Sequence, residues 1–209
     1  MRVERSSAVI YAKAIKLKNA ELALAKIAGK PMIEYVLDVL PDEVEDVLIA
    51  VENGKNLEEY EEIAEKYFAR TAKMKNLRGK VRNFIEFAIN SVEGDKLVVL
   101  PCDAPLITRD FASFLLECSK KFTATLPRSP SRKALYLMAS YRRKPFKEAF
   151  NAHPDEDMDD IVKKVGGVLY LSSNSLRIFD EKLGMFFRVS SVQDLRKAEK
   201  ILKMKKRRS

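Results

Sequence analysis

The stretch that decides the fold covers residues 96–108 and reads KLVVLPCDAPLIT. Residues 96–100 form a mostly apolar run, which is typical of a strand buried in a parallel sheet. Pro101 cannot donate a hydrogen bond to a neighbouring strand, so we expect the strand to stop before it. The following turn is bracketed by Pro101 and Pro105 and carries one carboxylate, Asp103. These residues predict a buried strand with a carboxylate just beyond its carboxyl end.

Strand-like and helix-like segments alternate on both sides of this stretch. Apolar runs predict strands at residues 7–12 (SAVIYA) and 46–51 (DVLIAV), and shorter strands at 123–126, 134–140, 168–171 and 185–189. Helices are expected over residues 31–40, 57–70, 79–92, 108 or 110 to about 120, 145–152, 157–165 and 192–206. This alternation predicts an α/β protein of three α/β/α layers, Rossmann-like, with a mostly parallel mixed sheet.

Ligands of such sheets bind at the carboxyl ends of strands, where the strand order reverses. The residues that follow Ala12, Val51 and Leu100 are therefore the first candidates for a site. A carboxylate at the position of Asp103 can hold Mg²⁺, which usually takes one or two protein carboxylates together with substrate phosphates. Asp103 can equally form only an Asx-turn, and position does not decide between the two readings.

Composition limits the classes of protein to consider. With 209 residues, we expect one domain over residues 1–202, followed by a basic tail at 203–209. The formal net charge of +9 favours anionic partners: nucleotides, phosphorylated metabolites or nucleic acid. The tail is also explained as a solvated helix end, where cations suit the helix dipole.

The cysteine count and the hydropathy pattern indicate the compartment. Two cysteines cannot build a disulfide framework or a Cys-rich zinc site, and their scarcity suits a reducing compartment. We find no secretory signal and no apolar run long enough to span a membrane, so we predict a cytoplasmic protein. Abundant lysine and glutamate, with Gln193 as the only glutamine, indicate a thermophilic source.

Residues 99–108 resemble the PCDxPLL signature of MobA-like NTP transferases, the family of the molybdenum-cofactor guanylyltransferases. In that family the aspartate binds the metal that bridges the nucleotide phosphates, which implies a Mg²⁺ ligand at Asp103. The block IAGKPMIEYVL at 27–37 is similar to the GKPLIEHVL segment of the same superfamily, especially of the KDO and sialic acid cytidylyltransferases. That match implies contacts to the triphosphate for Lys13 and Lys18, and the resemblance as a whole implies a GT-A-like nucleotidyltransferase fold.

The chain also departs from this family. Residues 11–20 read YAKAIKLKNA and contain no glycine, whereas MobA-like enzymes carry a glycine-rich loop here whose backbone approaches the phosphates. The lysine that often ends that loop is matched by Leu22, with Lys26 nearby. RVSSVQDL at 188–195 resembles the closing NVNTPEDL stretch, but the metal-binding position falls on Ser190, a poor Mg²⁺ ligand.

The resemblance implies in-line transfer of a nucleotidyl group from an NTP to an acceptor, with release of pyrophosphate. Asp103, Lys13 and Lys18 are the expected catalytic residues. The expected nucleotide contacts are Ala12, Lys13, Lys18, Lys26, Gly79, Lys80 and Arg82, although Lys80 and Arg82 also read as a solvated helix start.

The residues leave the activity itself open. Transfer of GMP to a phosphorylated small molecule in cofactor biosynthesis is the leading hypothesis. The alternatives are a nucleotide-binding or regulatory paralogue without catalysis, a cytidylyltransferase for an acidic sugar, and a nucleic-acid-associated protein.

Overall fold

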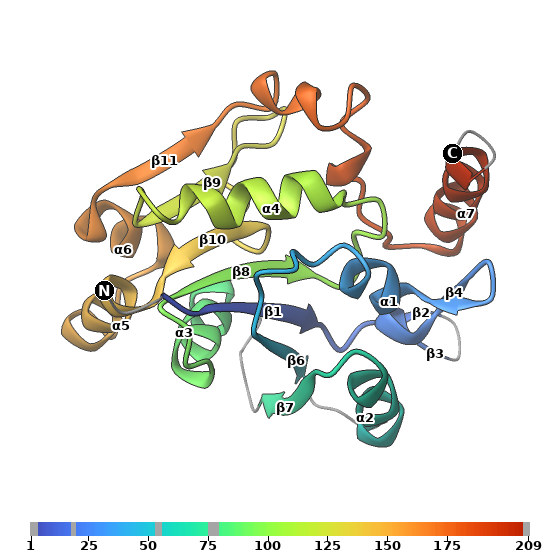
Figure 1. Cartoon of the computed structure of the whole chain (residues 1–209), viewed down its shortest axis with the longest axis horizontal. Coiled ribbons are helices and arrows are strands. Elements are labelled where there is room, and N and C mark those ends of the chain that lie inside the picture. Colours follow the sequence, from blue (N-terminus) through green and yellow to red (C-terminus); the bar gives the residue numbers. More distant parts are fainter. Residues whose placement is uncertain (1–3, 18–19, 53–55, 75–79, 207–209) are drawn as a thin grey trace.

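The computed structural model describes residues 4–17, 20–52, 56–74 and 80–206. At its centre lies a seven-stranded sheet with the order β11-β9-β10-β8-β1-β6-β7 (Figure 1). The strands are β1 (Ser6–Ala12), β6 (Asp46–Glu52), β7 (Arg70–Met74), β8 (Lys96–Pro101), β9 (Ala124–Pro127), β10 (Ala139–Arg142) and β11 (Val168–Leu171). The pairings of β10 with β8 and β9 are antiparallel, and the other pairings in this sheet are parallel. The predicted α/β class with a mostly parallel mixed sheet is confirmed.

Strand β1 lies in the interior of the sheet, between β8 and β6, and all seven of its residues are buried. It pairs in parallel with β6 and β8, so that Ile10 lies opposite both Ile49 and Leu100. Side chains alternate between the two faces of a strand, and both faces of β1 are covered. This explains why residues 8–12 are apolar without alternating, although the strand begins with the buried polar residues Ser6 and Ser7.

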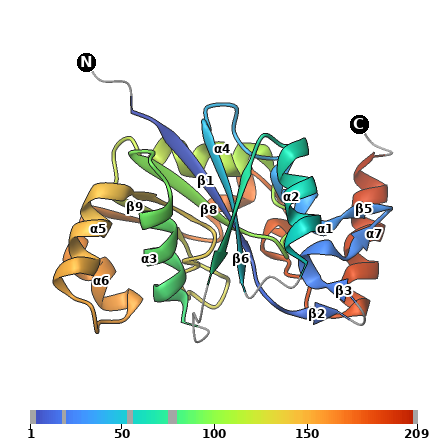
Figure 2. The same cartoon turned by 90° about the horizontal axis from the view of Figure 1, so that it is seen from below.

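Helices cover both faces of the sheet, as Figures 1 and 2 show for α4 and α3. On one face α1 (Met32–Leu37), α2 (Leu57–Lys66) and α4 (Arg109–Cys118) share a core cluster with β1, β6 and β8. On the other face α3 (Val81–Ser91), α5 (Arg143–Ala152) and α6 (Met158–Val165) share a second cluster. The predicted three layers are therefore present. No helix in the described ranges is long and apolar enough to cross a membrane.

A small subassembly lies beyond the carboxyl end of β1 (Figure 1). It consists of two short hairpins, the 3₁₀ helix η1 (Leu22–Leu24) and the last helix, α7 (Val192–Lys206). The hairpins pair β2 (Lys16–Leu17) with β3 (Ala20–Glu21) and β4 (Lys26–Ile27) with β5 (Lys30–Pro31). An apolar cluster that includes Leu22, Ile27 and Ala198 joins these pieces.

Two predicted helix starts are confirmed by their capping hydrogen bonds. The Thr108 hydroxyl accepts from the backbone N–H of Phe111 at 3.3 Å, at the start of α4. The Asp157 carboxylate accepts from the N–H of Asp160 at 3.0 Å, at the start of α6. The acidic run at 155–160 thus has the helix-start role that its composition suggests.

Several predicted elements differ from the structure. The strand predicted at 185–189 is wrong: η3 (Gly184–Phe186) occupies its start, and the N–H of Val189 donates to the carbonyl of Asp103 at 2.8 Å instead of to a strand. The strand predicted at 134–140 forms only from Ala139, because residues 135–138 close a turn. Strand β7 was not predicted, since its sequence, RTAKM, is short and two of its five residues are charged. Helix α7, in contrast, has the predicted bounds, Val192–Lys206, and it includes the start of the segment 203–209 that was expected as a basic tail.

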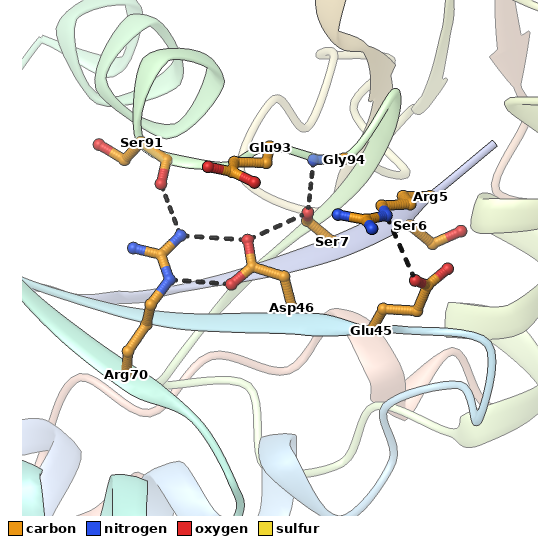
Figure 3. Close-up of a pocket in the computed structure, with 9 residues that line it drawn as sticks. All are labelled: Arg5, Ser6, Ser7, Glu45, Asp46, Arg70, Ser91, Glu93 and Gly94. Carbon is orange, nitrogen blue, oxygen red and sulfur yellow. Dashed lines mark hydrogen bonds and ion pairs between the residues drawn. The ribbon is translucent and has the colours of Figure 1, made fainter.

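The amino ends of the strands enclose a wide cavity of about 550 Å³, at the opposite end of the sheet from Asp103 (Figure 3). The Arg70 guanidinium donates to both carboxylate oxygens of Asp46, at 2.9 and 3.1 Å, and to the Ser91 carbonyl at 2.6 Å. The Ser7 hydroxyl donates to Asp46 at 3.3 Å and accepts from the N–H of Gly94 at 3.2 Å. These groups satisfy one another, so we interpret the network as structural.

The close approach at Gly94 gives a testable prediction. A Cβ there would lie 2.5 Å from the Ser7 hydroxyl oxygen and 3.0 Å from the Ser7 backbone nitrogen. Gly94→Ala should therefore lower the free energy of unfolding by about 1–3 kcal/mol, measured by urea denaturation. Glu93→Ala, at an exposed neighbouring position, is the control and should change it by less than about 0.5 kcal/mol. An unchanged midpoint for Gly94→Ala would contradict the tight packing.

Candidate functional site

Asp103 is held at the carboxyl ends of β1 and β8 by two backbone hydrogen bonds on its own turn. The N–H of Cys102 donates to the Tyr11 carbonyl at 3.1 Å, which continues the strand pairing beyond Pro101. The carbonyl of Asp103 accepts from the N–H of Val189 at 2.8 Å. The turn is thus tied to both the sheet and the segment before α7, and the carboxylate has a defined position.

A cavity of about 120 Å³ opens beside this turn. Four charged residues line it, Lys13, Lys80, Asp103 and Arg188, and it is closed by Tyr11, Ile15, Val81, Cys102 and Leu137. Three of the four charges are positive. Such an excess of positive charge at the ends of parallel strands favours a polyanion such as a triphosphate.

Arg188 is the residue of this site that the sequence did not reveal. Its Nε donates to the Asp103 carboxylate, and the two side chains form an ion pair across 85 positions of the chain. The signal was present in the closing stretch RVSSVQDL, where an arginine stands at the first asparagine of NVNTPEDL. The metal-binding position of that stretch matches Ser190, two residues later.

The loop after β1 is fixed by a buried carboxylate rather than by glycines. Glu52, at the end of β6, accepts from the Tyr11 hydroxyl and from the Ala14 backbone N–H, both at 3.2 Å. The Tyr11 ring stacks on Phe84 with 4.2 Å between centroids. Burial first, and then the negative charge of Glu52, raise the pKa of Tyr11 well above its usual value, so its hydroxyl stays a donor. The β2–β3 hairpin follows this loop.

The structure brings some of the predicted site residues together and separates others. Lys13, Lys80 and Asp103 share the cavity, and Ala12 is the buried last residue of β1. Lys18 and Gly79 lie outside the described residues. Lys26 is exposed on β4 and does not line this cavity.

Arg82 and Ser190 also lie outside the lining of the Asp103 cavity. Arg82 pairs with Glu86 at 2.6 Å, on its own helix. The Ser190 hydroxyl donates to Asp194 at 2.9 Å, in the first turn of α7. These contacts do not favour a metal-ligand role for Ser190, which stays a prediction.

A second and larger cavity of about 650 Å³ adjoins the first. It shares Lys80 and Val81 with the Asp103 cavity and extends over Arg82 and Tyr136 to residues 154–159. Its volume lies in the range of small-molecule sites. The two cavities thus meet at Lys80 and Val81.

The basic cluster at 141–144 has structural partners. Arg142 pairs with Glu4, Arg143 donates to the Ile89 carbonyl at 3.0 Å, and Lys144 lies 4.0 Å from Glu148. The cluster therefore ties the start of α5 to its neighbours, as a solvated and paired surface would.

The donor set at Asp103 suits a metal that arrives with its substrate. No three side chains of His, Cys, Asp or Glu gather into a metal site within the described ranges. Asp103 is the one carboxylate among the residues that line the cavity. Mg²⁺ commonly binds one carboxylate, substrate phosphates and waters, so a single carboxylate in a cavity that Lys13 and Lys80 also line fits it.

The fold and the cavity define an α/β protein with a positively charged candidate site at the carboxyl ends of β1 and β8. Residues 18–168, well over half of the chain, match the MobA-like NTP transferase domain. The chain therefore belongs to the MobA-like NTP transferase family, whose members are nucleotidyltransferases.

Known proteins agree with this assignment. The molybdenum cofactor guanylyltransferase of Shewanella amazonensis is 28% identical over 111 residues, which are 52% of this chain and 54% of that protein. The chain thus spans about half the length of the curated relatives it matches.

Solved structures support the fold over nearly the whole chain. The molybdopterin-guanine dinucleotide biosynthesis protein A of Archaeoglobus fulgidus superposes with a TM-score of 0.71 at 20% identity, over 95% of this chain and 99% of that one. The CMP:2-keto-3-deoxy-manno-octonic acid synthetase complexed with CTP has a TM-score of 0.68 at 14% identity, over 96% and 99%. At these identities the likenesses show the fold.

Cys102, beside Asp103, gives the prediction of this site. Burial first, and then the Asp103 carboxylate, raise the pKa of its thiol to about 12, so it stays protonated at neutral pH and is a poor nucleophile. In a Cys118→Ser variant, which leaves this one thiol, we expect native protein at pH 8 to react with Ellman's reagent about a hundredfold more slowly than unfolded protein. The Cys102→Ser variant, which keeps the half-buried Cys118, is the comparison. Fast labelling of native Cys102 would contradict its burial.

Proposed function

We propose that this chain transfers a nucleotidyl group from an NTP to a small-molecule acceptor, with GTP as the donor and pyrophosphate as the second product. The observation that carries the proposal is the shared cavity of Asp103, Lys13 and Lys80 at the carboxyl end of the central strands. One carboxylate and two lysines that line the same cavity suit a metal–triphosphate complex, since the carboxylate can hold the metal and the lysines can bind phosphate oxygens.

The reaction needs alignment and charge neutralisation more than covalent help. An acceptor oxygen would form a bond to the α-phosphorus, and the bond from that phosphorus to the bridging oxygen would break, releasing pyrophosphate. Lys13 and Lys80 would bind phosphate oxygens and take up the charge that develops on the leaving group. Asp103 would hold Mg²⁺, which supplies electrophilic stabilisation when bound. Cys102 takes no nucleophilic part, because its thiol is buried and protonated.

The preference for GTP rests on the relatives. The curated proteins that match are molybdenum cofactor guanylyltransferases, which makes GMP transfer to a phosphorylated acceptor in cofactor biosynthesis the first hypothesis. Cytidylyl transfer to an acidic sugar is the second, favoured by the block IAGKPMIEYVL at 27–37, which is similar to a segment of the KDO and sialic acid cytidylyltransferases. A reaction on such metabolites would take place in the cytoplasm.

The test is pyrophosphate release by wild type, Asp103→Asn and Asp110→Asn, with and without Mg²⁺. GTP with molybdopterin forms one arm, and CTP with an acidic keto-sugar forms the other. We expect turnover in one arm only, dependent on Mg²⁺, and a loss of about a hundredfold or more in Asp103→Asn. Asp110 is exposed in the first turn of α4, and its variant should keep wild-type activity.

Other outcomes decide between the alternatives. Nucleotide binding without turnover in either arm would favour a regulatory paralogue. Equal activity of Asp103→Asn and wild type would contradict the assigned site.

A further inference from the structure

The ion pair between Arg188 and Asp103 places a cation on the carboxylate that would bind the metal. We propose that Arg188 occupies the Asp103 carboxylate before substrate binds, and that an incoming metal–triphosphate complex displaces its guanidinium, which then binds the phosphates. The proposal rests on the nucleotide site proposed above and assigns a substrate-binding residue that the sequence did not reveal.

The environment of the Asp103 side chain supports this proposal. Its side chain is 15% exposed, so water reaches the carboxylate only in part. A carboxylate that is mostly removed from water requires a partner charge. Among the described contacts of the Asp103 side chain, Arg188 is that partner, and Lys13 and Lys80 line the same cavity. Arg188 and a divalent cation would therefore compete for one carboxylate.

The guanidinium of Arg188 is free to move while its backbone stays fixed. The N–H of Val189 donates to the Asp103 carbonyl at 2.8 Å, which holds the chain of Arg188 beside the turn. The Arg188 side chain is 38% exposed, more than twice the exposed fraction of Asp103. Rotation of the side chain can thus release the carboxylate without moving the backbone.

Once released, the guanidinium of Arg188 can bind phosphate oxygens. Arginine keeps its charge at all physiological pH values and offers a planar set of donors that matches phosphate oxygens. Released from Asp103, it would stay at the cavity that it already lines with Lys13 and Lys80, and the triphosphate is the ligand that these three cations would share. The hydroxyls of Ser190 and Ser191 both donate to Asp194, so the neighbouring polar groups are engaged elsewhere.

The experiment compares wild type with Arg188→Gln, Asp103→Asn and Arg196→Gln. Arg196 is exposed on α7, and its substitution removes the same charge away from the cavity. Mn²⁺ is the probe, and its free concentration is measured by electron paramagnetic resonance without nucleotide. We expect Arg188→Gln to bind Mn²⁺ about tenfold more tightly than wild type, because the competing cation is gone. Arg196→Gln should match wild type, and Asp103→Asn should lose the site.

The second measurement is calorimetric titration of the same proteins with GTP and with CTP in saturating Mg²⁺. Arg188→Gln should bind the preferred nucleotide about tenfold more weakly, since a phosphate contact is lost. Mn²⁺ binding to Arg188→Gln that is no tighter than to wild type would overturn the competition. Unchanged nucleotide affinity would overturn the phosphate contact. If wild type binds neither nucleotide while the Mn²⁺ result holds, the proposed function fails and the competition for Asp103 stands.

Discussion

The parallel pairing of β1 with β6 and β8 is the constraint on which the rest of the structure depends. Because the three strands run in the same direction and in register, their carboxyl ends lie at one edge of the sheet. Tyr11, Glu52 and Asp103, which are far apart in the sequence, therefore meet there. The hydrogen bond from Cys102 to the Tyr11 carbonyl extends this pairing beyond Pro101 and sets the position of the carboxylate.

The segment after β1 contains no glycine, and charged side chains line the cavity beside it. A glycine-rich loop presents backbone N–H groups to phosphates, but here the N–H of Ala14 is bound to Glu52. Glu52 gives the loop its shape, and Lys13, Lys80 and Arg188 supply the positive charge. The site thus combines one metal-type carboxylate with three cations, and its arginine is paired with that carboxylate in the structure described here.

Much of the fold could be predicted because its signals are local. The apolar run of β8, the Thr108 cap and the acidic start of α6 are each written in a few neighbouring residues. The missed elements depend on partners elsewhere in the chain. Strand β7 is short, and two of its five residues are charged. It forms because its backbone pairs with the edge of β6. Residues 185–189 are apolar enough for a strand, but the backbone of Val189 is bound to the Asp103 turn.

The candidate site was predictable to a similar extent. The place of Asp103 followed from the two prolines and the strand before them. The roles of Glu52 and Arg188 did not, because neither residue lies near Asp103 in the sequence. The sheet brings Glu52 to this edge, and the backbone hydrogen bond of Val189 to the Asp103 carbonyl brings Arg188 there. Lysines such as Lys26 carry no local sign of whether they face a cavity or solvent, so their assignment depended on the resemblance.

The central claim is that a metal–triphosphate complex binds at Asp103. The measurement that tests it is the thermal midpoint of wild type and Asp103→Asn with each of the four NTPs, in the presence and absence of Mg²⁺, because a ligand that binds the native state raises this midpoint. We predict that one NTP stabilises wild type only with Mg²⁺ and that Asp103→Asn loses this effect. The absence of any shift at millimolar NTP, or an equal shift in both proteins, would contradict it.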